Sequence, residues 1–287
     1  MTDLSSASLH RLDRFGTLIA TGPDAKSYLQ GQLCFDLERL TRERIELATC
    51  SSPQGRVQAV LWLIERDDAI VMLLPTSILD STLARLKKYV LRAKAKIESG
   101  AGRFQVCGAA ALLEGEPRAH REIGLRSYIR WPGNSPRVLC IAERELVAPA
   151  DAAFENAWHK ADIEAGLPQV YPQTHEAFVA QMLNVDLLGG IDFEKGCYTG
   201  QEIIARTHYC GAVKRRMFRF RTRSEAPAPG TRIVVGDQHA GDVVDAAATV
   251  DGSELLAVVS LASVDATLEL DTQERGRLER LAVPYAV

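Results

Sequence analysis

Residues 187–202 read Leu187-Leu188-Gly189-Gly190-Ile191-Asp192-Phe193-Glu194-Lys195-Gly196-Cys197-Tyr198-Thr199-Gly200-Gln201-Glu202. Four glycines fall within twelve positions of this segment. Because glycine costs backbone entropy inside helices and strands, such a cluster predicts a loop that needs positive φ angles or a close backbone approach to a ligand. The run 202–206 that follows is typical of a helix start. We therefore expect the chain to be organised around this glycine loop, residues 189–200.

Cys197 stands just before that expected helix and two residues from Lys195. A helix N-terminus and a nearby ammonium group both favour a thiolate over a thiol. We therefore predict that Cys197 is reactive, that Lys195 keeps it ionised, and that Gln201 or Glu202 orients it. The alternative is a tight turn with a small buried cysteine, since most free cysteines behave in that way.

The composition limits the classes of function. The chain has 287 residues, enough for two or three domains, and it is 46% hydrophobic and 25% charged, as in an ordinary soluble globular protein. Its net charge of −3 gives no general case for nucleic-acid binding, so we expect no direct contact with nucleic acid. No apolar run approaches the roughly 18 residues that a membrane span needs, and the first residues do not resemble a signal peptide.

Six cysteines are scattered along the chain without CxxC spacing, and no HExxH motif is present. This pattern predicts free thiols in a reducing cytoplasm and no metal site. His208 and Cys210 flank Tyr209, but two donors do not make a metal site. No phosphate-binding or dinucleotide-binding fingerprint is present either.

The first half of the chain predicts a mixture of strands and helices. A turn at Gly22-Pro23-Asp24 leads into a helix near Ala25. Strands at 57–64 and 69–74, joined by a turn at 66–68, form a hairpin, and a helix follows in which Ser77 and Asp80 are spaced as a capping box. With a strand at 93–98 this order is half of a split β-α-β plait, a ferredoxin-like subdomain at about 50–100. A second set of strands, at 104–109, 127–131 and 137–141, can complete a sheet.

The second half predicts a helix from about residue 150 to 165, ended by Gly166 and Pro168. Gln181 and Asn184 either line a cavity or cap a helix from about His175. A strand at 212–223 alternates phenylalanines with arginines. After a Pro-rich linker, short strands predict a small antiparallel barrel of about 60 residues.

Several motifs together resemble the YgfZ family, the folate-binding relatives of the glycine-cleavage aminomethyltransferase. The run 195–202, followed by Gly211-Ala212-Val213-Lys214-Arg215, is similar to that family's signature. Further similar pieces lie at 22–24, 29–32, 55–57 and 163–168, so the resemblance covers about residues 12–220.

The resemblance implies an α+β, aminomethyltransferase-like fold. Two interleaved α/β plait subdomains would surround a central cavity in residues 1–225, and residues 226–287 would form a C-terminal antiparallel β-barrel. The cavity would hold tetrahydrofolate or a one-carbon derivative. The residues that the resemblance assigns to the folate are Trp158, Phe15 (at a position where tryptophan is typical), Glu164, Gln181, Asn184 and Tyr198. Each also has a structural alternative, such as core packing for Trp158 or an exposed helix end for Glu164.

Six lysines and arginines occupy ten positions, 214–223. Such a cluster is usually a solvated face, but it could also attract the glutamate tail of a folate or, as the weaker alternative, RNA phosphates.

The function implied by the resemblance is that of a tetrahydrofolate-binding accessory protein in iron-sulfur cluster assembly or repair, which supports tRNA modification indirectly. Reduced folate and iron-sulfur enzymes or assembly factors are the implied partners of what we expect to be a cytoplasmic monomer. Whether Cys197 transfers a one-carbon unit or sulfur stays open. Two alternatives remain: an aminomethyltransferase acting on tetrahydrofolate, disfavoured because the Lys-Gly-Cys-Tyr motif is not typical of those enzymes, and a non-catalytic binding protein.

Overall fold

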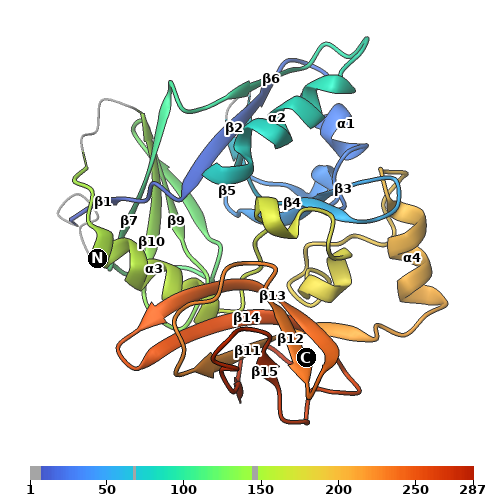
Figure 1. The fold of residues 1–287 in the computed structure, drawn as a ribbon. Coiled ribbons are helices and arrows are strands. Elements are labelled where there is room, and N and C mark those ends of the chain that lie inside the picture. The colour runs from blue at the N-terminus through green and yellow to red at the C-terminus, as the bar shows by residue number, and fades with distance from the viewer. Residues whose placement is uncertain (1–7, 67–68, 144–147) are drawn as a thin grey trace.

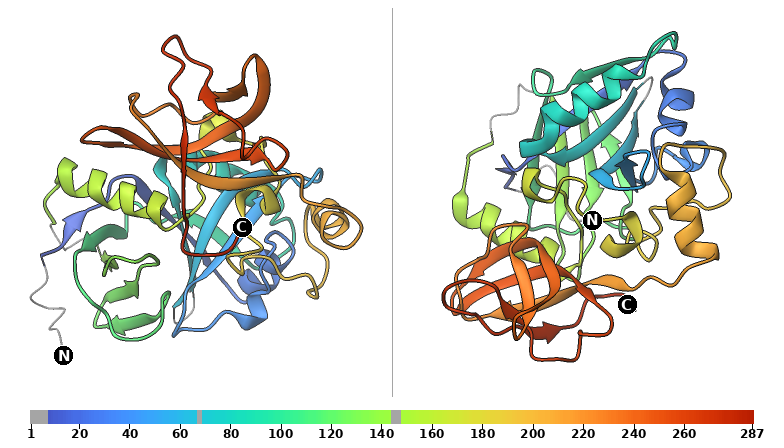
Figure 2. Two further views of the ribbon diagram at one scale, coloured as in Figure 1. Left: turned by 90° about the horizontal axis from the view of Figure 1, so that it is seen from below. Right: turned by 45° about the vertical axis from the view of Figure 1, so that its right-hand side comes forward.

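Three antiparallel sheets account for most of the residues that the computed structural model describes, namely 8–66, 69–143 and 148–287 (Figure 1). Two of the sheets lie side by side, and the third, formed by the C-terminal part of the chain, lies across one end of them (Figures 1 and 2). No helix in the described ranges is long and apolar enough to cross a membrane.

The first sheet belongs to a plait of strands and helices. Its strands have the order β3-β4-β5-β2-β6. Along the chain come β2 (Phe15–Thr21), α1 (Ala25–Gln30), a 3-10 turn η2 (Leu37–Arg39), β3 (Glu46–Ser51), β4 (Val57–Arg66), β5 (Ala69–Pro75), η3 (Thr76–Ile78), α2 (Leu79–Lys88) and β6 (Lys96–Ser99). The predicted hairpin is confirmed as β4 and β5, although Asp67 and Asp68 of its turn lie outside the described residues.

Two details of this plait differ from the prediction. The missing half of the β-α-β unit comes from β2 and α1 upstream, so β2, α1, β4, β5, α2 and β6 form a ferredoxin-like order. The capping box at Ser77 and Asp80 is wrong, because residues 76–78 form a 3-10 turn and the helix begins only at Leu79, without a side-chain cap. The sequence pattern predicted a helix correctly, but the 3-10 turn moved its N-cap from Ser77 to Ile78.

The second sheet has the order β1-β7-β10-β9-β8. It contains β1 (His10–Arg11), β7 (Phe104–Ala109), β8 (His120–Ile123), β9 (Arg126–Arg130) and β10 (Val138–Glu143). The predicted second set of strands therefore lies together in one sheet, with β1 and β8 at its edges. Because β1 precedes β2 but pairs with β7, the two sheets are interleaved along the chain.

Helix α3 (Ala152–Glu164) packs on this second sheet, where Trp158 lies against Gly108 of β7. Asp151 caps the helix by accepting a hydrogen bond from the backbone N–H of Phe154 at 3.0 Å. The predicted helix is confirmed, and it ends before Gly166, whose φ is +65°. One hydrophobic core joins both sheets, and the rings of Trp62 and Trp131 meet in it with centroids 5.1 Å apart.

The segment between α3 and the C-terminal sheet is mostly irregular. It holds the short 3-10 turns η4 (Pro172–Thr174) and η5 (Ala180–Leu183) and the helix α4 (Gln201–Tyr209), which confirms the helix start predicted after the glycine loop. The helix expected from about His175 is wrong. Only one turn forms there, and it stops at Asn184, which has the left-handed φ of +58°.

The C-terminal sheet curls on itself. Its order is β15-β12-β13-β14-β11-β16, from β11 (Arg215–Thr222), β12 (Arg232–Val235), β13 (Gln238–Thr249), β14 (Gly252–Ser260), β15 (Glu269–Leu270) and β16 (Glu279–Leu281). A backbone hydrogen bond from Leu278 to Leu268 draws its two edges together. Phe218 and Phe220 face the inside, as the alternation predicts. Strand β11 lies before residue 225, so this sheet extends across the boundary expected there.

Candidate functional site: the glycine loop

Two glycines with left-handed backbones bring the glycine loop and α4 against the turn between β3 and β4. Gly200 has a φ of +86°, and a Cβ there would lie 2.7 Å from the carbonyl oxygen of Ser52. Gly55 has a φ of +70°, and a Cβ there would lie 2.8 Å from Cβ of Ile203 in α4. Real Cβ atoms do not come so close to other atoms, so both positions need glycine. This contact fixes where the loop meets the body of the protein.

Lys195 anchors the loop from inside. Its ammonium donates hydrogen bonds to the carbonyl oxygens of Gln30 at 2.8 Å, Leu33 at 2.7 Å and Phe35 at 2.7 Å. The side chain is 7% exposed, and burial lowers the pKa of Lys195 to about 8. An ammonium group has three hydrogens, and all three are directed to these carbonyl oxygens rather than to Cys197.

Asp192 shapes the turn that precedes Lys195. Its carboxylate accepts hydrogen bonds from the backbone N–H groups of Glu194 at 2.9 Å and Lys195 at 3.0 Å, and from Arg39 at 2.9 Å. Although partial burial alone would raise the pKa of Asp192, these hydrogen bonds hold it below its usual value. The turn is therefore built around a fixed negative charge.

Cys197 is exposed, as is Cys210, which directly follows α4. Cys34, Cys50, Cys107 and Cys140 are buried, and no disulfide is present among the described residues. Burial raises the pKa of each buried thiol, to about 11 for Cys50 and Cys107 and about 12 for Cys140. Since thiolates are the reactive form, the two exposed cysteines are the candidates for chemistry.

Cys34 is a buried neighbour of the loop that sequence reasoning missed. Its sulfur accepts a hydrogen bond from the backbone N–H of Thr49 at 3.1 Å and donates one to the carbonyl oxygen of Gly190 at 3.0 Å. Burial raises its pKa, while the charge of Lys195 acts in the opposite direction. The positive charge of Lys195 therefore acts on the thiol of Cys34. The sequence did not predict this interaction because the two residues are far apart along the chain.

The remaining predicted residues of the loop are close to Cys197 in the sequence. Tyr198 is buried, its ring centroid is 5.1 Å from the Lys195 ammonium, and burial raises the pKa of its hydroxyl. Gln201 begins α4 and is half-buried, whereas Glu202 is exposed. The ring of Phe193 stacks on His208 with centroids 3.7 Å apart, so the loop folds back along α4.

The other residues predicted for the folate are two buried pairs and the half-buried Glu164. Trp158 (2% exposed) and Phe15 (5% exposed) meet Trp131 in the core between the two sheets. Gln181 and Asn184 are fully buried and donate hydrogen bonds to the carbonyl oxygens of Ile204 in α4 and Met217 in β11, each at 2.7 Å.

Glu164 is half-buried and forms ion pairs with Lys160 at 2.6 Å and Arg219 at 3.6 Å. Two surface clefts are outlined by described residues, one of about 1830 Å³ between α3 and the C-terminal sheet and one of about 600 Å³ beside Leu187–Gly189. Neither cleft is lined by Cys197 or by the six residues predicted for the folate. Trp158, Phe15, Gln181 and Asn184 are buried against other protein atoms and lie outside both clefts.

The cations of β11 are largely neutralised. Arg216 forms a bidentate pair with Asp186 at 2.6 and 2.9 Å, and Arg221 forms one with Glu279 at 2.6 and 2.8 Å. Arg219 contacts Glu254 at 2.5 Å. These partners leave little free positive charge on the strand.

Known proteins of similar sequence cover nearly the whole chain. It is 35% identical, over 97% of its length and 92% of the relative's, to tRNA-modifying protein YgfZ of Edwardsiella ictaluri. It is 31% identical to the protein of the same name from Sodalis glossinidius, with 98% and 93% of the two chains covered. No family profile matches the chain.

Among solved structures, the chain is similar to the glycine cleavage system aminomethyltransferase T of Bartonella henselae, with a TM-score of 0.65. The match covers 97% of this chain and 85% of that one at 12% identity. At that identity it shows the fold alone, an aminomethyltransferase-like α+β fold, which agrees with the fold expected from the sequence.

Proposed function

The chain belongs to the YgfZ family, and from this premise we propose that it is a folate-binding accessory protein whose reactive group is the Cys197 thiol. Its task in this proposal is to help assemble or repair iron-sulfur clusters, and so to support tRNA modification indirectly. The relatives' name, tRNA-modifying protein, supports the link to tRNA modification.

The observation that carries the proposal is an exposed thiol on a firmly anchored loop. Cys197 is open to solvent, while its neighbour Lys195 is buried and fully hydrogen-bonded two residues away. A nucleophile on a rigid support keeps its orientation when a partner approaches, which lowers the entropy cost of reaction. In this proposal Lys195 is a positioning residue, and Gln201 or Glu202 orients the thiol.

The residues predicted for the folate carry two polar atoms that favour a buried polar ligand. Within the described residues, neither Nε1 of Trp158 nor Oε1 of Gln181 has a hydrogen-bond partner, although both atoms are buried. Buried polar atoms are normally paired, and a pterin ring offers both donors and acceptors. When bound, a reduced folate would supply a carrier for one-carbon units.

The test compares the two exposed thiols of the same protein. Iodoacetamide alkylation is followed by peptide mass spectrometry at Cys197 and Cys210, with and without tetrahydrofolate. We expect tetrahydrofolate to slow alkylation at Cys197 at least about threefold and to leave Cys210 unchanged. Equal alkylation rates at Cys197 with and without tetrahydrofolate would mean that the ligand does not shield this thiol, and would contradict the proposal.

A second test asks whether the thiol is needed in cells. Cells that carry only Cys197→Ser should lose activity of an iron-sulfur enzyme under oxidative stress, while cells with Cys210→Ser should keep it. Full activity with Cys197→Ser would reduce the protein to a binding role.

Aminomethyltransferase activity remains the alternative that the shared fold suggests. An assay of tetrahydrofolate-dependent methylene transfer from a lipoyl-bound amine distinguishes the two, and we expect no turnover. Turnover that depends on the folate residues and not on Cys197 would favour the alternative.

A further inference from the structure

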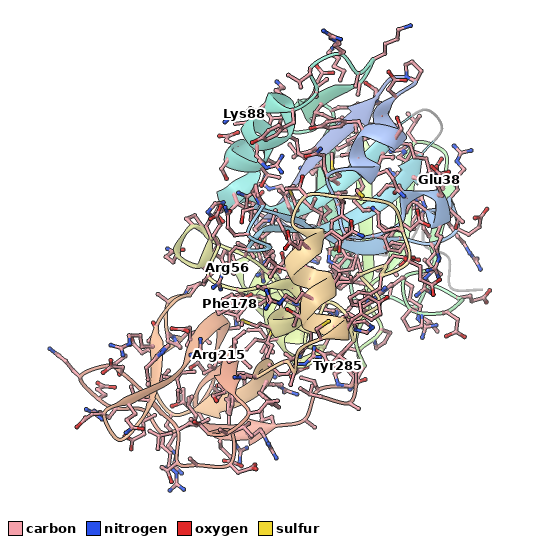
Figure 3. All side chains as sticks on the ribbon, turned by 90° about the vertical axis from the view of Figure 1, so that its right-hand side faces the viewer. Glu38, Arg56, Lys88, Phe178, Arg215 and Tyr285 are labelled. Atoms are coloured by element: carbon pink, nitrogen blue, oxygen red, sulfur yellow. The ribbon has the colours of Figure 1, made fainter. Side chains whose placement is uncertain are left out.

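A second cluster of cations lies outside the glycine loop. The basic segment, residues 85–96, reads Arg-Leu-Lys-Lys-Tyr-Val-Leu-Arg-Ala-Lys-Ala-Lys and contains six cations and no acidic residue. It covers the last turns of α2, the following loop and the first residue of β6. Lys88 marks it in Figure 3, at the opposite end of the molecule from the C-terminal sheet. In a chain of net charge −3, this is a local excess of positive charge.

The charges of the basic segment are available to a partner. Lys87, Lys88, Arg92 and Lys94 are exposed, and within the described residues none of these four forms an ion pair. Lys94 is held in place through its backbone N–H, which donates to Asp24 at 2.7 Å, so its ammonium stays free. The arginines of β11, by contrast, are held by acidic partners. Each cluster contains six lysines and arginines, but only in the basic segment are most of the positive charges without acidic partners in the described ranges.

An aromatic ring lies among these cations. Tyr89 is 44% exposed. The guanidinium of Arg85 lies 4.5 Å from its ring centroid, and the ammonium of Lys88 lies 5.7 Å from it. Arg85 is itself fixed by the side-chain oxygens of Gln58 at 3.1 Å and Gln32 at 2.9 Å. The ring is therefore held as a rigid surface on which a flat group can stack.

Leu91 combines an unfavourable backbone conformation with an exposed apolar side chain. It has a left-handed φ of +43°, which costs a residue with a Cβ about 1–2 kcal/mol. Its side chain is also 86% exposed, so no burial offsets that cost. Backbone strain of this kind concentrates at functional positions. Leu91 stands two residues from Tyr89 and adds a second exposed apolar side chain to the segment.

We propose that the basic segment binds single-stranded nucleic acid, with Lys87, Lys88 and Arg92 on the phosphates and Tyr89 stacked on a base. Proteins that bind single strands without sequence preference combine cations that contact the phosphate backbone with aromatic rings that stack on the bases. The basic segment has both features. This replaces the expectation that the protein makes no direct contact with nucleic acid, which rested on net charge and on the cluster in β11. It does not depend on folate or on Cys197.

An anionic membrane surface is the competing partner for a basic segment with exposed apolar residues. An interfacial helix needs a free apolar face, but the apolar face of α2 is turned inward, with Leu79 and Leu86 buried. Only Tyr89 and Leu91 remain as exposed large apolar side chains in the segment. The geometry therefore favours stacking on bases over insertion into lipid.

The experiment measures fluorescence anisotropy of a labelled 12-nucleotide RNA of mixed sequence with the full chain, free of folate, at several salt concentrations. The variant Lys87→Ala/Lys88→Ala/Arg92→Ala removes phosphate contacts, and Tyr89→Ala removes stacking. The charge-matched control is Arg121→Ala/Arg223→Ala/Arg277→Ala, which removes three exposed cations elsewhere, none of them ion-paired within the described residues. Circular dichroism melts verify that each variant folds.

We expect the triple variant in the basic segment to bind at least about tenfold more weakly and to lower the slope of log K against log salt by about 2, since each phosphate contact contributes roughly 0.7. Tyr89→Ala should weaken binding about fivefold to hundredfold with the slope unchanged, and Tyr89→Phe should restore it. DNA of the same sequence should bind equally, because neither contact involves the 2′-hydroxyl.

Three outcomes would overturn the proposal. The first is no binding of the RNA by the wild-type chain at 100 mM salt and tens of micromolar protein. The second is equal loss in the triple variant and its charge-matched control, which would mean general charge attraction. The third is binding to phosphatidylserine vesicles without binding to the RNA, which would assign the segment to a membrane surface.

Discussion

At the scale of single residues, the role of Lys195 is decided by contacts with residues far away in the sequence. Its position two residues before Cys197 predicts an influence on that thiol, but its ammonium is bound to carbonyl oxygens of residues 30, 33 and 35. Those partners are more than 150 positions away in the sequence, and no local pattern indicates them. The glycines and the exposed cysteine could be predicted because they depend on local backbone rules.

Replacing Lys195 with methionine should therefore act on stability first. Lys195→Met keeps the volume but leaves three buried carbonyl oxygens without donors, and we expect a loss of about 2–4 kcal/mol in the free energy of unfolding. Urea unfolding measures this loss. The control is Lys94→Met, whose ammonium is exposed and which should change stability by less than about 0.5 kcal/mol. Comparable losses in both variants would contradict the anchoring role of Lys195.

Leu91 gives a residue-scale prediction of opposite sign. Leu91→Gly relieves the left-handed strain but adds the entropy of glycine to the unfolded chain. Because the side chain is exposed and no packing is lost, we expect stability to stay the same or to rise by up to about 1 kcal/mol. RNA binding should weaken in the same variant. A thermal melt together with the anisotropy titration separates the two effects, and a marked fall in melting temperature would show that Leu91 is needed for packing.

At the scale of elements, strands were predicted well where apolar residues alternate or run continuously, as in β4, β5 and β7. Apart from the β4–β5 hairpin, pairing between strands was not predicted, because it depends on residues far apart: β2 joins β5 and β6, and β1 joins β7. The helix expected near His175 failed for a local reason. Asn184 adopts a left-handed conformation and ends the turn after four residues.

The junction of α4 with the β3–β4 turn can be tested at its two glycines. Gly200→Ala places a Cβ 2.7 Å from a backbone oxygen at a φ of +86°, so we expect a loss of about 2–4 kcal/mol and a loop that is cut faster by proteases. Gly196→Ala is the matched control in the same loop, because no atom lies within 4 Å of its added Cβ and its φ is not positive. Its stability should change by less than about 0.5 kcal/mol. Similar losses in both would show that the close approach at Gly200 is unimportant.

At the scale of the whole molecule, one buried carboxylate ties the C-terminal sheet to the rest of the chain. Asp245 of β13 contacts His159 of α3 at 2.9 Å, the hydroxyl of Tyr171 at 2.8 Å and Arg14 at 3.5 Å. These partners come from the N-terminal region, from α3 and from the segment after it. No sequence pattern predicted the cluster, because its members are isolated single residues that only the folded chain brings together.

Asp245 should make the attachment of the sheet depend on pH. Burial alone would raise the pKa of Asp245, but His159, Arg14 and Tyr171 together hold it below its ordinary value. A carboxylate whose pKa is lower in the folded chain than in the unfolded chain stabilises the fold above the unfolded pKa of about 3.9, and this contribution disappears as the pH falls through the folded pKa. Asp245→Asn should cost about 3 kcal/mol at pH 7, since it leaves the largely buried guanidinium of Arg14 without its carboxylate. The cost relative to wild type should shrink as the pH is lowered toward and below 4.

Urea unfolding of both proteins at pH 7, 5, 3.5 and 2.5 measures that difference. Asp237→Asn is the control, because Asp237 is 93% exposed and pairs with Arg275 on the surface, where solvent screens the ion pair. A difference for Asp245→Asn that stays constant from pH 7 to pH 2.5 would mean that the hydrogen bonds, and not the charge, hold the sheet in place. A difference that shrinks on acidification would identify this one carboxylate as the group through which pH controls how firmly the C-terminal sheet is attached.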